Sequence, residues 1–213
     1  VFKTIISQFK KEQRHFEESD YRFTRLNCPY QDTLHNNGLG NEVSYTGMTW
    51  SGFRPSDDAC KYGYLVPSNM FAVVALRYIE EIAEKIYYDH KLAESAKKLS
   101  NEIEDGINKF AVVDHEKYGR IYAYEVDGRG NALLMDDANV PSLLSIPYIE
   151  YRTYDDEIYQ NTRKFILSKD NPYYYEGKDA RGIGSAHTPE NYIWHIALSI
   201  QGLTTESKQE KIR

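Results

Sequence analysis

Cysteine is scarce in this sequence of 213 residues, and a net positive charge and long apolar runs are absent. Its two cysteines, Cys28 and Cys60, are too few for a disulfide scaffold and show no spacing typical of a zinc site. We therefore expect two reduced thiols, no bound metal and no cofactor. No stretch approaches the ~18 consecutive apolar residues of a membrane-spanning helix. The formal net charge of -6 argues against a protein that binds nucleic acid through its phosphates.

A secretory signal is also missing, because no positively charged segment is followed by a short apolar run. On this ground we expect a cytoplasmic protein that does not act at a membrane. The first residue is Val1 rather than Met, so the chain can have been processed or cut at this end. Its length fits one domain or a piece of a larger one.

Apolar residues recur at three- and four-residue spacings in several segments, as in helices that bury one face. The pattern predicts helices near the start (Phe2 to Phe16), from about Ser68 to Tyr88, from about His90 to Phe110 and from about Asp155 to Leu167. A fifth helix is predicted with Thr188 as its N-cap and Pro189 as its first residue. A sixth is predicted to begin at Thr204 or Thr205.

Strand signals are few. Residues 121–126 and 132–135, joined by a glycine-containing turn, predict one short hairpin. The longest segment without periodicity runs from about Asp20 to Pro67, and loops of that length in a compact domain are usually functional. We therefore predict an all-α fold with long loops. Helices joined alternately by short and long connections fit a toroid of helical hairpins, in which the long loops gather over one end.

The segment from Thr46 to Cys60, which reads TGMTWSGFRPSDDAC, holds the densest group of polar and aromatic residues. Adjacent buried carboxylates do not readily ionise together, so either Asp57 or Asp58 could stay protonated near neutral pH and act as a general acid. Arg54 could hold the other carboxylate in its ionised form, and Trp50 could stack on a sugar ring. A helix that starts here, capped by a serine and with acidic residues in its first turn, explains the same residues without catalysis.

A second polar segment, MDDANVPSLL, spans residues 135–144 and again places two carboxylates before an apolar stretch that we predict to be helical. Asp136, Asp137 and Asn139 are candidate ligand-binding residues. The structural alternative is that Asp137 or Asn139 caps the helix that follows.

A third segment, GIGSAHTP at residues 182–189, combines two glycines with His187. The glycines let the backbone approach a ligand closely, while a lone histidine at a helix entrance often serves only as a structural hydrogen-bonding group. Just before it, NPYYY places Tyr173 in a loop with two further tyrosines, which suits a ligand wall or a packed loop equally well.

Four ordered segments resemble glycoside hydrolase family 125. They are GMTWSGFRPSDDACKYGYLVPSNM (47–70), YEVDGRGN (124–131), MDDANVPSLLS (135–145) and GIGSAHTPENYIWHIALSIQGLT (182–204). The resemblance implies an (α/α)₆ barrel and a metal-independent exo-α-1,6-mannosidase that releases terminal mannose from an α-mannoside oligosaccharide or N-glycan with inversion of configuration.

The resemblance also implies roles for individual residues. It places the general acid at Asp57 or Asp58, and analogy with related barrels favours Asp57. The sugar site would be lined by Trp50, Arg54, Asp136, Asp137, Asn139, Tyr173 and His187.

The general base of the family is a glutamate in a His-Glu-Ser-Phe motif near the C-terminus, and this sequence has no such motif. Family members are also roughly twice this length. We therefore expect residues 1–213 to be part of a single catalytic domain, truncated at both ends, that covers about half of the barrel and is inactive alone.

Two other function classes remain open from the residues. The aspartate pairs could bind Mg²⁺ and diphosphate in a metal-dependent, terpenoid-type helical enzyme, although no DDxxD run is present. A fragment that binds carbohydrate without cleaving it would use the same aromatic and polar loops.

Overall fold

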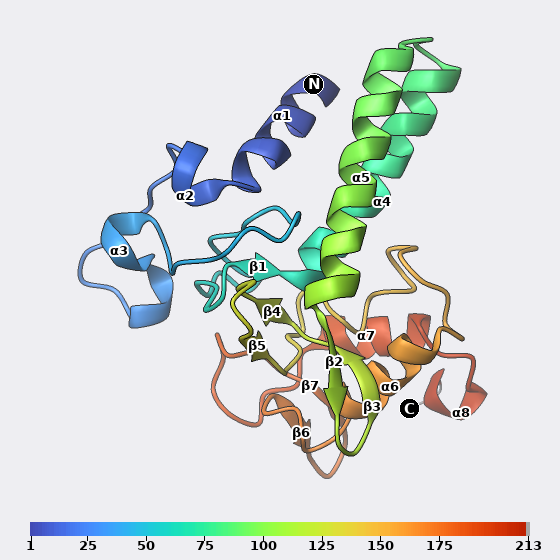
Figure 1. Ribbon diagram of the computed structural model, residues 1–213. Coiled ribbons are helices and arrows are strands. Elements are labelled where there is room, and N and C mark those ends of the chain that lie inside the picture. The colour runs from blue at the N-terminus through green and yellow to red at the C-terminus, as the bar shows by residue number, and fades with distance from the viewer. Residues whose placement is uncertain (212–213) are drawn as a thin grey trace.

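The computed structural model describes residues 1–211 and is mostly helical, with short strands between the helices (Figure 1). The helices are α1 (Phe2–Glu12), α2 (His15–Glu18), α3 (His35–Gly38), α4 (Val66–Lys85), α5 (His90–Phe110), α6 (Glu157–Ile166), α7 (His195–Leu203) and α8 (Lys208–Lys211), with a 3-10 turn at Tyr30–Asp32. The strands are β1 (Tyr64–Leu65), β2 (Val112–His115), β3 (Gly119–Tyr122), β4 (Glu125–Val126), β5 (Ala132–Leu133), β6 (Tyr174–Glu176) and β7 (Arg181–Ile183). Among these helices, none has the length and apolar character needed to cross a membrane.

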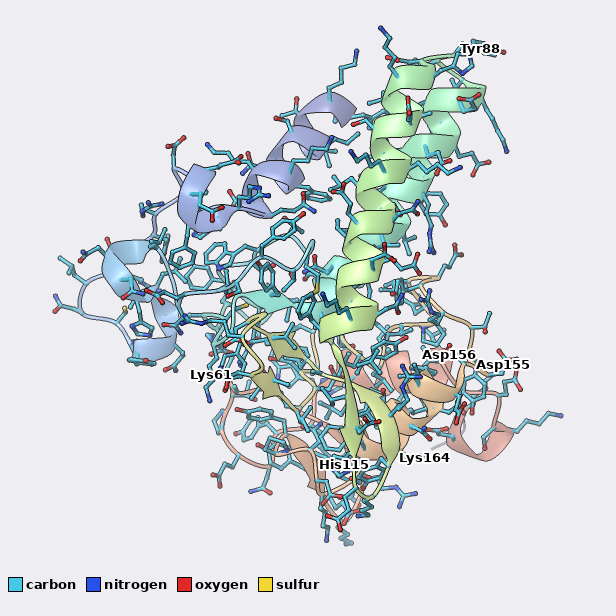
Figure 2. The ribbon with its side chains drawn as sticks, in the orientation of Figure 1. Lys61, Tyr88, His115, Asp155, Asp156 and Lys164 are labelled. Carbon is cyan, nitrogen blue, oxygen red and sulfur yellow. The ribbon has the colours of Figure 1, made fainter. Side chains whose placement is uncertain are left out.

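Helices α4 and α5 form the longest regular unit, an antiparallel hairpin whose tip at Tyr88 points away from the loops (Figures 1 and 2). The apolar stripe of α5 is fully buried along the hairpin, with Leu99, Ile103 and Ile107 inaccessible to solvent. Burial of each such side chain is worth about 1.5–3 kcal/mol. The carboxylate of Asp89 caps α5 by accepting a hydrogen bond from Leu92 N (3.1 Å). The predicted bounds of α5 are confirmed.

Three further predicted helices are confirmed with shifted ends. Helix α4 begins two residues before the predicted start and stops three residues before the predicted end. Helix α1 ends at Glu12, and the apolar residue Phe16 lies in the separate short helix α2. Helix α6 begins after Asp156, whose carboxylate accepts a hydrogen bond from Tyr159 N (2.8 Å).

The predicted start of the fifth helix is wrong. Helix α7 begins at His195, because Trp194 N donates to Ile183 O in β7 (3.1 Å) and so ties the preceding segment to a strand. Asn191 has a positive φ of 67°, which interrupts a right-handed helix. The hydroxyl of Thr188 donates to Ser185 O (3.1 Å) instead of capping a helix. The tertiary contact with β7 thus overrides a strong local start signal.

The helices predicted at Thr204 and after Pro141 are also wrong. Thr204 terminates α7, with its hydroxyl donating to Ile200 O (2.7 Å), and α8 starts only at Lys208. The apolar residues 142–150 form successive turns rather than a helix. These turns are held by the carboxylate of Asp136, which accepts hydrogen bonds from the backbone further along the chain.

The structure is mostly helical, as predicted, but it contains more short strands than the one predicted hairpin. The β4–β5 hairpin is confirmed in shortened form, and β1 joins it to make a three-stranded antiparallel sheet. The β2–β3 and β6–β7 hairpins were not predicted. Each is too short for a clear alternation of apolar and polar residues, so the sequence carries little signal for them.

The long loop from Asp20 to Pro67 is mostly irregular, as predicted, and it packs on the N-terminal helices. Its contact with them centres on His15, whose ring stacks on Trp50 at 3.5 Å between ring centroids. The two ring nitrogens of His15 lie 2.6 Å from Glu12 Oε2 and 2.8 Å from Leu39 O. The N-terminal helices therefore anchor this loop at a buried polar cluster.

Candidate active site

The two aspartates of the SDDAC motif lie on a tight turn over residues 54–58. Arg54 N donates to Asp58 O (2.8 Å), and Asp57 N donates to Arg54 O (3.0 Å). Phe53 and Ala59 form a β-bridge across the base of this turn. A helix capped here by a serine, the structural alternative for this motif, is therefore wrong.

This turn gives the adjacent carboxylates opposite surroundings. Asp57 sits at the tip with a positive φ of 71° and an exposed side chain. Asp58 is buried, with 2% of the residue exposed. The hydroxyl of Ser56 donates to Asp58 Oδ2 (2.9 Å), while Asp58 Oδ1 is buried without a hydrogen-bond partner. The nearest basic group to Oδ1 is His187 Nδ1 at 3.6 Å, on a half-exposed side chain.

Arg54 is held on the other side of the turn by a residue that sequence reasoning missed. Its Nε lies 2.6 Å from Oε1 of Glu125, which is completely buried in β4. Burial works against the charge of Arg54, but the carboxylate of Glu125 outweighs it and raises the pKa of the guanidinium. Glu125 lies in the YEVDGRGN segment of the family resemblance and in a short predicted strand, but neither signal marks it as the partner of Arg54.

Asp137 joins this group from the second predicted segment. The hydroxyl of Ser185 donates to Asp137 Oδ2 (3.3 Å), and Asn139 N donates to Oδ1 (3.3 Å). Burial raises the pKa of Asp137, against the opposing effects of Ser56, Asn139 and the charge of Arg54. The charge of Arg54 thus reaches Asp137, so the structure places the second polar segment near the 54–58 turn.

Asp136, next to Asp137 in sequence, holds the backbone of the turn that follows Pro141. Its two carboxylate oxygens accept hydrogen bonds from Leu143 N (2.8 Å) and Leu144 N (3.0 Å). Burial raises its pKa to about 8, although these bonds favour the ionised form. A direct sugar contact was predicted for Asp136, but the structure gives both of its oxygens backbone partners.

The third segment is tied to the second by backbone hydrogen bonds. Ala138 N donates to Gly184 O (3.1 Å), and Gly184 N donates to Tyr173 O (2.8 Å). A side chain at Gly184 would meet Tyr192 O at 2.3 Å, so this close approach requires glycine. Tyr173 is half-buried, and this burial raises its pKa. The charge of Arg54 lowers the pKa of Tyr173, while the charges of Asp58 and Asp137 raise it.

Trp50 does not join this cluster. Its ring is buried in the loop region, where it stacks on His15 and lies within van der Waals reach of Gly40 and Gly63. Neither face of the Trp50 ring is therefore open to a sugar in this structure, although stacking of a sugar on Trp50 was predicted. Tyr124 does lie in the cluster, but it is fully buried, and Arg54 Cζ lies 5.7 Å from its ring centroid.

Like Asp58 Oδ1, the hydroxyl of Tyr124 is buried without a hydrogen-bond partner; Trp50 Nε1 and Asp32 Oδ1, outside this cluster, are also unpaired. Burial raises the pKa of Tyr124, and the neighbouring charges of Asp137 and Asp136 raise it further. Buried polar groups in proteins are usually paired, so unpaired ones in one cluster mark a place where a ligand or water is expected. Within residues 1–211, no three His, Cys, Asp or Glu side chains form a group that could hold a metal ion.

Comparison with known proteins agrees with the arrangement of these loops. The family model of metal-independent alpha-mannosidases, GH125, matches residues 1–213. The chain belongs to glycoside hydrolase family 125. Its segments around Asp58, Asp137 and Gly184 are those on which the family resemblance was based.

Two relatives of this GH125 chain are informative. A metal-independent alpha mannosidase of Streptococcus pneumoniae, solved as a non-productive complex with alpha-1,6-mannobiose, is 52% identical with a TM-score of 0.96. The match covers 99% of this chain and 50% of that one. The Meiotically up-regulated gene 157 protein of Schizosaccharomyces pombe is 42% identical over 192 residues, which are 89% of this chain and 38% of that protein. The chain thus spans half or less of the length of these two relatives.

Proposed function

We propose that residues 1–213 contribute the acid-bearing part of the catalytic domain of an exo-acting α-1,6-mannosidase. The observation that carries the proposal is that Asp137 lies near the turn that carries Arg54 and Asp58, in a member of this family. The backbone of this chain matches that of a mannosidase solved with α-1,6-mannobiose, with a TM-score of 0.96, and this match supports the substrate class. The two long helices α4 and α5 fit one hairpin of a single (α/α)₆ barrel, of which this chain would make about half.

Asp58 is our candidate for the general acid. One oxygen, Oδ2, is fixed by the hydroxyl of Ser56, and a proton on Oδ1 has no acceptor among the described residues. That proton would be available to the glycosidic oxygen of a mannoside, which needs it as the bond to the leaving sugar breaks. The exposed Asp57 at the tip of the turn has no such orienting contact from a neighbouring side chain.

The remaining residues suit the recognition of sugar hydroxyls. Asp137 accepts hydrogen bonds, Arg54 and His187 can donate them, and Tyr173 adds an aromatic wall with a polar edge. Asn139 lies beside Asp137, with its amide nitrogen 3.5 Å from Asp137 Oδ1. Together they form a polar site of the kind that fixes the orientation of one terminal sugar.

Inversion requires a second carboxylate about 6.5–9.5 Å from the acid, with a water between the two. We propose that this general base is a glutamate outside residues 1–213, as the family resemblance implies. One assay can distinguish this proposal from the two alternatives, a metal-dependent enzyme and a protein that binds carbohydrate without cleaving it.

The test compares a polypeptide of family length that carries these residues with the 213-residue chain, using α-1,6-mannobiose as substrate. Proton NMR is used to identify the first-formed anomer of mannose, with and without EDTA. We expect β-mannose from the longer protein, unchanged by EDTA, and at least ~10²-fold slower release from the 213-residue chain, since loss of a general base typically costs 10²–10⁴-fold.

Three results would contradict this proposal. First-formed α-mannose would show retention of configuration. Loss of activity in EDTA would favour a metal-dependent enzyme. Binding of mannobiose by the longer protein without any hydrolysis would favour a carbohydrate-binding role.

A further inference from the structure

Glu125 is a fully buried carboxylate that contacts the site, and the proposed chemistry does not use it. It lies in β4 with no exposed surface. Burying a charged carboxylate is costly unless every oxygen is paired, so such a residue usually has a specific partner. Glu125 has three partners, and all of them belong to the loop over residues 54–62.

The two oxygens of Glu125 divide these partners between them. Oε1 accepts from Arg54 Nε (2.6 Å), while Oε2 accepts from Lys61 N (2.7 Å) and Tyr62 N (3.0 Å). Figure 2 shows Lys61 at the side of the molecule near the β4–β5 hairpin. One carboxylate therefore fixes both ends of the loop that carries Asp57 and Asp58.

The guanidinium of Arg54 is held by one nitrogen only. Nε pairs with Glu125, while Nη1 and Nη2 make no hydrogen bond to any residue in the described part of the chain. The side chain is 8% exposed. Its charge acts on Asp137 and Tyr173, both of which belong to the candidate site. The two terminal nitrogens are thus left to donate to a ligand from a fixed, planar group.

We infer that Glu125 is a positioning residue, which holds Arg54 by Nε so that Nη1 and Nη2 donate to hydroxyl oxygens of the bound mannoside. The inference rests on the proposed function for the identity of the ligand. The contact between Glu125 and Arg54 does not depend on that function, so it can be tested separately.

The variant Glu125→Gln separates the two halves of the contact. Its amide oxygen can still accept from Lys61 N and Tyr62 N, whereas its NH₂ group faces the Nε–H of Arg54, donor against donor. Glu42→Gln is the matched control, because it breaks the exposed ion pair between Glu42 and Arg129 (2.8 Å) instead. Thermal unfolding of both variants checks that the fold survives.

The first measurement is the Nε–H signal of Arg54 in ¹⁵N NMR, assigned with Arg54→Lys. We expect slow exchange with water in the wild type and in Glu42→Gln, and at least ~10-fold faster exchange in Glu125→Gln, as for loss of a hydrogen bond to a charged group. Fast exchange in the wild type would overturn the inference, whether or not the protein hydrolyses mannosides.

The second measurement is kcat/KM for α-1,6-mannobiose in the protein of family length. Glu125→Gln should lower kcat/KM about 10-fold or more, mostly through KM, and should cost little further in an Arg54→Gln background. An unchanged kcat/KM, or an equal loss in both backgrounds, would overturn the role of Arg54 as the group that Glu125 positions. A wild type without any turnover would instead contradict the proposed function, and the NMR result alone would then decide whether Glu125 holds Arg54.

Discussion

The α4–α5 hairpin and the loops around Asp58 are built from the same chain by different means. The hairpin buries apolar residues at regular spacing, so its two helices pack along their whole length. The loops bury polar residues, and some of these are held by a partner far away in sequence, as Arg54 is by Glu125, 71 residues later. Local periodicity therefore describes the first region, while the second exists only once the fold has brought its segments together.

The two regions also differ in how they tolerate change. Apolar packing in the hairpin is shared among many side chains, so one altered contact weakens stability without affecting chemistry. In the loops, a single carboxylate such as Asp58 or Glu125 has few partners and cannot be replaced by its neighbours. Substitutions in each region should thus separate stability from activity.

The largest expected effect comes from the aspartate pair. In the protein of family length, Asp58→Asn should lower kcat on α-1,6-mannobiose by about 10²–10⁴-fold, as for removal of a general acid. Asp57→Asn should have a much smaller effect, because its side chain is exposed at the tip of the turn. Steady-state kinetics of both variants, with circular dichroism as the fold control, provide the comparison. A larger loss in Asp57→Asn would assign the acid to Asp57 instead.

A smaller effect is expected where the hairpin meets the loops. A methyl group at Gly106 of α5 would lie 2.4 Å from Thr46 O, so Gly106→Ala should destabilise the protein by about 1–3 kcal/mol despite the higher helix propensity of alanine. Gly202 of α7 has open space at the same position. Gly202→Ala should therefore be neutral or stabilise by up to about 1 kcal/mol.

Denaturant unfolding of both glycine variants measures this difference. Equal stabilisation by Gly106→Ala and Gly202→Ala would show that α5 and the loop at Thr46 are not in close backbone contact. The boundary between the two regions would then be looser than the structure indicates.

The smallest expected effect is the pH dependence of stability that Glu12 causes, where the N-terminal helices contact the long loop. Burial favours protonation of Glu12, but hydrogen bonds from His15 and Ser19 outweigh it and lower its pKa below the ordinary value of 4.5. The folded state therefore favours ionised Glu12 more than the unfolded state does. The stability that this preference contributes is present above pH 4.5 and is lost as the pH falls through the lowered pKa. After solvent screening we expect about 1 kcal/mol or less.

The measurement is the unfolding temperature between pH 6 and pH 3 for the wild type, Glu12→Gln and the exposed control Glu17→Gln. Glu12→Gln should show a shallower loss of stability with acid than the other two proteins. Parallel curves for all three proteins would mean that ionisation of Glu12, in the polar cluster around His15, does not contribute to stability.

The sequence predicted the hairpin well because its signals are local. The stripe of α5 and the N-cap at Asp89 lie within the segment that they organise, and the predicted bounds match the structure. The start of α7 failed for the opposite reason. Thr188 and Pro189 give a strong local signal, but the hydrogen bond from Trp194 to β7 decides where the helix begins.

The candidate site shows the same division. Motifs identified the segments of Asp58, Asp137 and His187, since carboxylates and glycines cluster in the sequence itself. The partner of Arg54 could not be found in this way, because a buried glutamate in a two-residue strand resembles any other charged residue until its neighbours are known. The same holds for Trp50, whose aromatic ring suited a sugar site but packs against His15.

The sequence by itself determined the family, the long helices and the loops that carry polar residues. Those features depend on spacings and motifs within short segments. Only the tertiary structure decided which aspartate is buried, which residue holds Arg54 and where α7 starts. Each of these depends on burial and contacts that form only in the folded chain, where a low local dielectric strengthens hydrogen bonds such as that between Glu125 and Arg54.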